Sequence, residues 1–191
     1  MRIETMILLG SVIVFIASIW NWFRYDRKHK ELSGLLIENI EQQLDVRRTI
    51  ATGLYYRFKN GKDSYTDMTF EEFVVDLFEK TYGGELFYTS IAEGFGVDFE
   101  DRREDGRYFI QLKCSQEDVS FHDVALLHSA VVKWDSAGGY IATTASFTKE
   151  AVEYGEGLGI TLINGIDLAD MWLKALQEQE EYMIEGRPIR T

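Results

Sequence analysis

GVDFEDRREDGRYFIQLKC, residues 96–114, contains two apolar runs separated by a short charged segment. Asp105-Gly106 between the runs is a strong signal for a two-residue β-hairpin turn. In the register set by that turn, Asp98 of the first strand lies opposite Lys113 of the second, with Gln111 on the same face. A register moved by two residues would keep these three side chains together, because strand faces alternate with a period of two.

The other face of this predicted hairpin is apolar throughout. A charged amine in a strand that is otherwise fit for burial costs free energy unless a partner compensates it, and Asp98 is such a partner for Lys113. The simplest interpretation is an ion pair on a solvated face, which is common in sheets. The apolar face holds Val97, Phe99, Ile110, Leu112 and Cys114.

The charged face also suits phosphodiester hydrolysis. The Asp98 carboxylate and the Gln111 amide oxygen are hard ligands for a divalent cation such as Mg²⁺ or Mn²⁺, and the backbone carbonyl of Leu112 offers a further oxygen. A bound cation acidifies water and stabilises charge on phosphate. Lys113 can then orient or deprotonate that water, or neutralise the developing charge.

From residue 67 onward, strand and helix patterns alternate, which predicts an α/β domain with a central mixed β-sheet flanked by helices. Thr69 and Glu72 form a capping-box pair at the start of a helix that ends near Gly83-Gly84. The remaining patterns predict strands at 85–90, 96–100, 108–114, 138–144 and 160–164, and helices at 120–133, 147–156 and 167–181.

The N-terminal run MILLGSVIVFIASIWNWF, residues 6–23, is apolar apart from one Asn and is about long enough to cross a bilayer. Basic residues follow it, which predicts an outside N-terminus and a cytoplasmic body, anchored in the cell membrane by one transmembrane helix. A cleaved signal peptide is disfavoured, because no net positive charge precedes the run and no small-x-small site follows it. A buried core helix is the third alternative.

Residues 31–60 place leucine and isoleucine at three- and four-residue spacing, which predicts a further helix. This helix is either a stalk that forms a homo-oligomer through residues 31–50 or a helix packed on the main domain, and the sequence leaves both open. The turn signal KNGKDS then divides the chain. The predicted domains are a membrane anchor with its basic flank at 1–30, a helical linker at 31–65 and the α/β domain at 66–191.

The composition limits the class of function. The single cysteine, Cys114, excludes an internal disulfide framework and argues against a cysteine-based zinc site. The formal net charge of −12 is unfavourable for long-range attraction to nucleic acid. Local cationic patches would offset it, and the sequence offers two groups: Arg47, Arg48, Arg57, Lys59 and Lys62 before the domain, and Arg102, Arg103 and Arg107 near the hairpin turn.

Motifs across the α/β domain resemble the Mrr-like restriction endonucleases of the PD-(D/E)xK nuclease superfamily. In that family a helix begins with Phe-Glu, a loop of the form G-x-G-[ILV]-D follows, and a strand carries Q-x-K. Later segments of this chain also resemble the family, namely VSFHDV (119–124), GGYIATTASFTKEAVEYG (138–155) and ITLINGIDL (160–168). The three motifs here are Phe70-Glu71, Gly94-Phe95-Gly96-Val97-Asp98 and Gln111-Leu112-Lys113.

The resemblance covers residues 66–176 and implies a restriction-endonuclease-like core. It implies that Asp98 and Gln111 bind the metal, that Lys113 is the catalytic lysine, and that Glu71 supports the site. Phe95 stands where the family often has an acidic residue, which puts a second metal in doubt.

The sequence therefore predicts a membrane-anchored, metal-dependent nuclease with DNA as its partner. RNA is not separated from DNA as the substrate. The alternative is a non-catalytic, membrane-tethered binding or assembly module built on the same fold, which the acidic composition favours.

Overall fold

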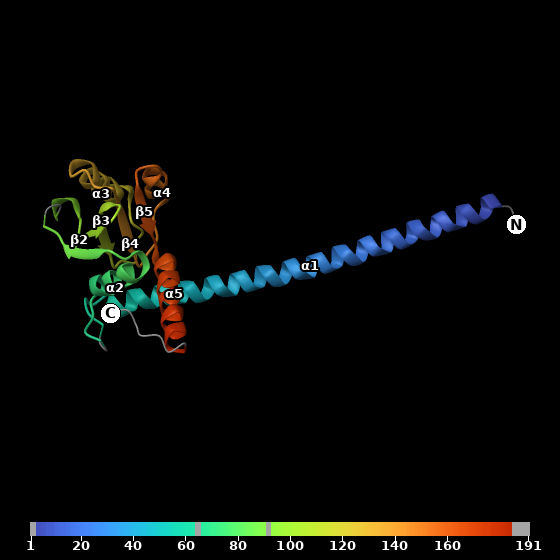
Figure 1. Cartoon of the computed structure of the whole chain (residues 1–191), viewed down its shortest axis with the longest axis horizontal. Helices are drawn as coiled ribbons and strands as arrows, with labels where there is room; N and C mark the ends of the chain where they lie inside the picture. Colours follow the sequence, from blue (N-terminus) through green and yellow to red (C-terminus); the bar gives the residue numbers. More distant parts are fainter. Residues whose placement is uncertain (1–2, 64–65, 91–92, 185–191) are drawn as a thin grey trace. The chain divides into compact units, whose positions relative to one another are not determined.

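The computed structural model describes residues 3–63, 66–90 and 93–184. The chain divides into two compact units between Asp45 and Val46. Helix α1 (Ile3–Phe58) begins in the first unit and ends in the second (Figure 1). The predicted domain boundaries at residues 30 and 65 stay predictions.

The first unit is the N-terminal part of α1, which confirms a helix in this region. Among the described residues, no helix is both long and apolar enough to cross a membrane. The predicted span, residues 6–23, is therefore not supported, and most of its side chains up to residue 17 lie outside the described ones. Self-association through residues 31–50 stays a prediction. The large apolar side chains exposed there in the single chain are Leu35, Leu36, Ile37, Ile40, Leu44 and Val46.

The second unit is the predicted α/β domain. The described strands and helices follow the expected order, with the last residues of α1 added in front. These elements are α2 (Phe70–Tyr82), β1 (Glu85–Tyr88), the 3₁₀ turn η1 (Glu93–Phe95), β2 (Phe99–Arg103), β3 (Gly106–Lys113), α3 (Phe121–Lys133), β4 (Gly138–Thr143), α4 (Lys149–Gly155), β5 (Ile160–Ile163) and α5 (Gly165–Ile184).

One five-stranded sheet in the order β1-β2-β3-β4-β5 organises this unit. The first three strands pair antiparallel, whereas β3, β4 and β5 pair parallel through the helical crossovers α3 and α4. The predicted mixed sheet is therefore confirmed. The parallel strands are apolar runs because helices cover both of their faces.

Two apolar cores lie on opposite faces of the sheet. The end of α1, together with α2 and α5, covers the face that carries Phe99 and Ile110. Helices α3 and α4 cover the face that carries Phe109 and Ile141. Burial of each such large apolar side chain stabilises the fold by about 1.5–3 kcal/mol, so the hairpin strands are held firmly from both sides.

The β2–β3 hairpin forms, but its register differs from the predicted one. Phe99 pairs with Ile110, and Arg103 pairs with Gly106, so the turn lies one residue earlier than predicted. Gly106 directly follows that turn: its φ is +149°, and a Cβ there would lie 2.6 Å from the Cβ of Ala137. Both the positive φ beside the turn and the close approach of Ala137 therefore favour a glycine here.

The predicted assignment of Val97 to the same face as Phe99 is wrong. Val97 packs with Phe109 in the core beneath α3, whereas Phe99 belongs to the core on the other face. The cause is that β2 begins only at Phe99, so the residues before it do not follow the alternation of a strand.

Candidate active site

Asp98 directly precedes β2 and faces the neighbouring strand. Its Oδ2 accepts a hydrogen bond of 2.7 Å from the backbone N–H of Leu112. The N–H and C=O of one strand residue point to the same edge, so the Leu112 carbonyl also points toward the edge where Asp98 lies. The structure thus brings the Asp98 carboxylate close to one of the predicted backbone ligands.

Gln111 lies on the same part of β3 and is only 6% exposed. Its Oε1 is buried and has no hydrogen-bond partner among the described residues. A buried acceptor without a partner costs about 1–3 kcal/mol, and such atoms in native folds call for an explanation such as a bound ion.

The glycine at position 96 makes room for this amide. Gly96 has a φ of +70°, and a Cβ there would lie 2.5 Å from Nε2 of Gln111. Any other residue would displace the glutamine or strain the backbone. At Gly94, no atom of the described residues lies within 4 Å of the Cβ position, so the two glycines of the G-x-G motif differ in their surroundings.

Glu71 reaches the site from the first turn of α2. The helix begins with the predicted capping box, in which the Thr69 hydroxyl accepts from the Glu72 N–H at 3.1 Å and Glu72 accepts from the Thr69 N–H at 2.8 Å. Glu72 is thus occupied at the cap. Glu71 and Asp98 instead line one pocket of about 400 Å³, which the sheet edge and α2 form together.

The surroundings of Asp98 disfavour its charge. Burial raises the pKa of its carboxyl group, and the nearby Glu71 raises it further, against the backbone hydrogen bond from Leu112 and the positive charge of Lys113, which lower it. A carboxyl group whose pKa is raised by burial and a second acid is a frequent feature of active sites.

Lys113 does not form the predicted ion pair across the hairpin. Its Nζ donates to Oδ1 of Asp123 in the first turn of α3. Asp123 also accepts from the backbone N–H and the hydroxyl of Ser120, at 3.2 and 2.9 Å. Burial would raise the pKa of Asp123, but the hydrogen bonds from Lys113 and Ser120 outweigh it and lower that pKa.

Sequence reasoning did not identify Asp123 as a neighbour of the site. A signal for it was present, because Ser120 and Asp123 have the spacing of a capping box directly after the β3 strand. The acid of a capping box folds back toward the start of its helix. Here that position brings Asp123 into contact with Lys113 at the end of β3.

The residues of the candidate site carry oxygen atoms that could serve as ligands of a hard divalent cation. These belong to the carboxylates of Asp98 and Glu71, the amide of Gln111 and the Leu112 carbonyl, all of them oxygen ligands of the kind that Mg²⁺ and Mn²⁺ prefer. No three His, Cys, Asp or Glu side chains in the described part of the chain gather around a possible metal position, so any cation here depends on the amide and backbone oxygens.

Most of the cations expected to attract nucleic acid are engaged within the fold. In the first group, Arg47 pairs with Asp170, Arg57 with Asp63 and Lys62 with Asp67. These three side chains therefore do not form a free cationic patch.

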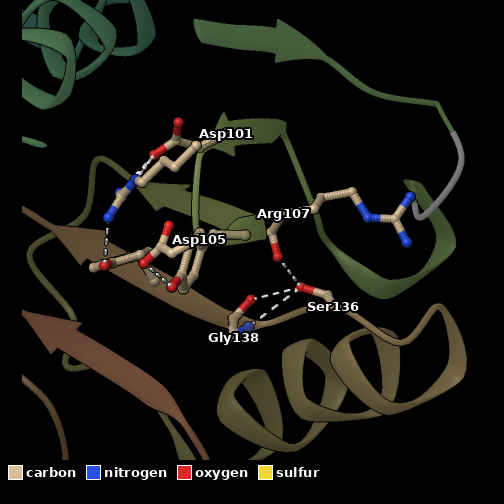
Figure 2. Close-up of polar contacts among 8 residues, drawn as sticks. Asp101, Asp105, Arg107, Ser136 and Gly138 are labelled. Atoms are coloured by element: carbon tan, nitrogen blue, oxygen red, sulfur yellow. Dashed lines mark hydrogen bonds and ion pairs between the residues drawn. The ribbon is translucent and has the colours of Figure 1, made fainter. Parts of the chain in front are cut away.

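The second group, near the hairpin turn, is also engaged. Arg102 pairs with Glu100, and Arg103 pairs with the buried Asp101. The Arg107 guanidinium donates to the Trp134 carbonyl. Figure 2 shows Asp101 beside a guanidinium, and the Ser136 hydroxyl bridging the backbone of Arg107 and Gly138.

Comparison with known proteins extends these observations. Residues 63–172, more than half of the chain, match the Mrr_cat family, described as a restriction endonuclease. No curated protein matches the sequence. Among solved structures, the DNA modification-dependent restriction endonuclease AspBHI is similar, with a TM-score of 0.51 and 15% identity over 73% of this chain and 39% of that chain.

A second solved structure, the MspJI restriction endonuclease in complex with a 27-mer oligonucleotide, has a TM-score of 0.39 and 22% identity over 53% of this chain and 26% of that chain. The likeness to AspBHI shows a shared fold. The chain spans well under half the length of either of these two proteins.

Proposed function

This chain belongs to the Mrr_cat restriction endonuclease family, and from that premise we propose that it is a DNA endonuclease that hydrolyses phosphodiester bonds with bound Mg²⁺ or Mn²⁺. The observation that supports this most strongly is the buried Oε1 of Gln111, which has no hydrogen-bond partner among the described residues and belongs to the residue next to Leu112, whose backbone N–H donates to Asp98. An oxygen-binding cation would satisfy the Gln111 oxygen and relieve the repulsion between Asp98 and Glu71.

When bound, the cation would acidify a water molecule and stabilise charge on the phosphate. Asp98, Gln111 and the Leu112 carbonyl would hold it from β3 and the start of β2. Glu71 would bind or orient a water from the α2 side of the same pocket.

Lys113 would act as a fixed positive charge. The Asp123 carboxylate holds its ammonium group, and an oriented ammonium is suited to neutralise charge that develops on a phosphate oxygen. This arrangement favours orientation and charge neutralisation over removal of a proton from water, the other role that the sequence left open for this lysine.

The test uses the full chain with plasmid, linear and single-stranded DNA, in Mg²⁺, in Mn²⁺ and in chelator. We expect cleavage that requires the cation, and a loss of about 100-fold or more in Asp98→Ala and in Lys113→Ala. Asp76→Ala and Lys80→Ala are matched controls, because these two residues pair on the exposed side of α2. Cleavage that survives in both site variants would contradict the proposed site.

A non-catalytic binding or assembly module remains the second candidate. The net charge of −12 favours it, as does the engagement of the expected DNA-binding arginines. This candidate predicts no cleavage of any substrate and no calorimetric signal for cation binding by the wild-type chain.

The predicted membrane location depends on the sequence of residues 6–23 alone and stays a prediction. Fractionation of cells that express the full chain tests it, with carbonate extraction to separate integral from peripheral association. Recovery of the chain in the soluble fraction would contradict the predicted anchor.

A further inference from the structure

Tyr88, the last residue of β1, presents an aromatic ring to solvent beside the candidate site. The residue is 75% exposed, although its ring packs on that of Phe99 with centroids 4.3 Å apart and planes inclined by 41°. Phe99 is buried in the core. One side of the tyrosine ring is therefore supported by the fold while much of the ring remains accessible.

The same tyrosine lines the pocket that contains the two candidate catalytic carboxylates. Asp98 and Glu71 border this pocket of about 400 Å³, together with the apolar side chains of Val97 and Phe99. Its volume lies in the range of sites that hold one small organic group. A flat apolar group in it would lie against Tyr88 and within the same pocket as Asp98.

We propose that this pocket takes an unpaired nucleobase of the strand to be cut, stacked on Tyr88, next to the phosphate that is held at Asp98. The inference rests on the proposed nuclease function and deepens it, because it names the substrate class: a single strand, or a duplex with a mismatched or extruded base. Intact, fully paired DNA would be a poorer substrate.

The charges of the pocket favour a base over a phosphate at this position. Its lining includes two carboxylates and no Lys or Arg among the described residues, so a phosphate would be repelled there unless a cation lay beneath it. A base is neutral and offers its π-face to the tyrosine. Ser90, also in the lining, can exchange hydrogen bonds with the edge of the base.

The expected contribution of the tyrosine is large enough to measure. Stacking of a base on an aromatic side chain is typically worth a factor of roughly 5 to 150 in affinity, and it tolerates any base because every base has a π-face. In a strongly acidic protein that lacks steering toward DNA, such a contact would supply much of the binding.

The experiment measures binding of the full chain to oligonucleotides that carry the fluorescent base 2-aminopurine at successive positions, with Ca²⁺ as the oxygen-binding cation. The probes are a single strand, a duplex with a central mismatch, a paired duplex and an RNA single strand. We expect quenching at one position, and an affinity for the first two that falls roughly 5- to 150-fold in Tyr88→Ala. Tyr88→Phe keeps an aromatic ring at this position, so this variant should retain the wild-type affinity.

Two further arms make the result specific to stacking. An abasic site at the quenched position should weaken wild-type binding as much as Tyr88→Ala does, and combining the two should add nothing. Tyr154→Ala, on α4 and 42% exposed, is the matched control and should bind as the wild type does.

Equal affinity of wild type and Tyr88→Ala for every probe would overturn the inference, and so would binding to the paired duplex as tight as to the single strand. If cation-dependent cleavage is seen in that case, the proposed function stands without the base site. Position-specific quenching in a chain that cleaves nothing would support the base site and contradict the nuclease. Equal binding of the RNA strand supports the base site and widens its substrate class.

Discussion

The β2–β3 hairpin carries an aspartate near each end. One carboxylate is paired with a cation, whereas the other lies near a second acid. Near the turn, Asp101 is fully buried and pairs with Arg103, whose guanidinium lies 4.6–5.0 Å from the ring centroids of three tyrosines, Tyr82, Tyr108 and Tyr140. At the open end, Asp98 is half-buried, accepts a backbone N–H and faces a second acid, Glu71.

This difference indicates that the end near the turn contributes to stability and the open end to the candidate site. A buried charge that is matched by an opposite charge and by aromatic rings belongs to the fold, and removing one partner leaves the other uncompensated. Asp98 instead lies beside a second acid, and burial raises its pKa. A carboxylate whose charge the fold disfavours in this way is typical of a functional site.

The largest effect is expected at the closed end. Asp101→Ala should lower the free energy of unfolding by about 3–5 kcal/mol, because the largely enclosed Arg103 guanidinium would lose the buried carboxylate that neutralises it. Urea denaturation followed by circular dichroism measures this. Asp105→Ala is the matched control on the same hairpin, since the exposed Asp105 accepts a hydrogen bond of 2.8 Å from the Tyr108 hydroxyl (Figure 2), and its loss should cost about 1 kcal/mol or less.

The double variant Asp101→Ala/Arg103→Met sharpens this test. Methionine can pack against the tyrosine rings without a charge, so the double variant should be more stable than Asp101→Ala alone. If the double variant is no more stable than the single one, charge compensation is not what holds the closed end together.

At the open end, the next effect is expected from the two glycines of the G-x-G motif. Gly96→Ala should lower cleavage activity by about 100-fold, because the new Cβ would displace the Gln111 amide and a misplacement of about 1 Å can cost that much. The cost in stability should be near 1 kcal/mol, from the positive φ. Initial rates of plasmid cleavage and thermal unfolding measure the two effects.

Gly94→Ala is the control for this pair, since its Cβ position is open. It should leave both rate and stability nearly unchanged. Equal losses in Gly94→Ala and Gly96→Ala would mean that the motif acts through the loop as a whole and not through the space above Gln111.

The hairpin and the face that each side chain of a strand occupies could be predicted from the sequence, because successive side chains of a strand alternate between the two faces of the sheet. The pairing register differs from the predicted one by two residues, and a shift of two leaves Gln111 and Lys113 of β3 on one face of the strand. Asp98 precedes β2, so its grouping with these two side chains stays a prediction. The predicted register is wrong because Gly106 follows the turn and pairs with Arg103. Part of the need for glycine there comes from the nearby Ala137, and a neighbour that distant in the sequence leaves no local pattern.

The partners of the charged residues were the less predictable part. Arg103 was interpreted as a DNA-binding cation because its aromatic partners come from α2, β3 and β4, which only the fold brings together. Lys113 was assigned to Asp98 for a similar reason, since the carboxylate that it contacts belongs to the next helix. Local patterns specify which face a side chain occupies, whereas long-range packing decides which charge it meets.

The smallest effects should distinguish the two acids of the open end by sign. The pKa of Asp98 is raised in the folded chain, first by burial, so its ionisation opposes folding once the pH rises above about 3.8, the ordinary value for this group. The pKa of Asp123 is lowered because the hydrogen bonds from Lys113 and Ser120 outweigh burial. Its ionisation therefore stabilises the fold above that pH, and the contribution is lost as the pH falls through the folded value.

Asp98→Asn should thus raise the Tm near pH 7, and Asp123→Asn should lower it. Each shift should be about 1 kcal/mol or less, or up to roughly 4 °C, because both groups are partly open to solvent and their interactions are screened. The difference for Asp98→Asn should shrink as the pH falls toward 3.8, because the folded pKa of Asp98 lies above that value, whereas most of the difference for Asp123→Asn should persist to pH 4, because the folded pKa of Asp123 lies below it. Thermal unfolding between pH 4 and 7.5 with a chelator present measures the two variants without cation binding. Shifts of the same sign would show that burial and ion pairing do not separate these two carboxylates as the structure implies.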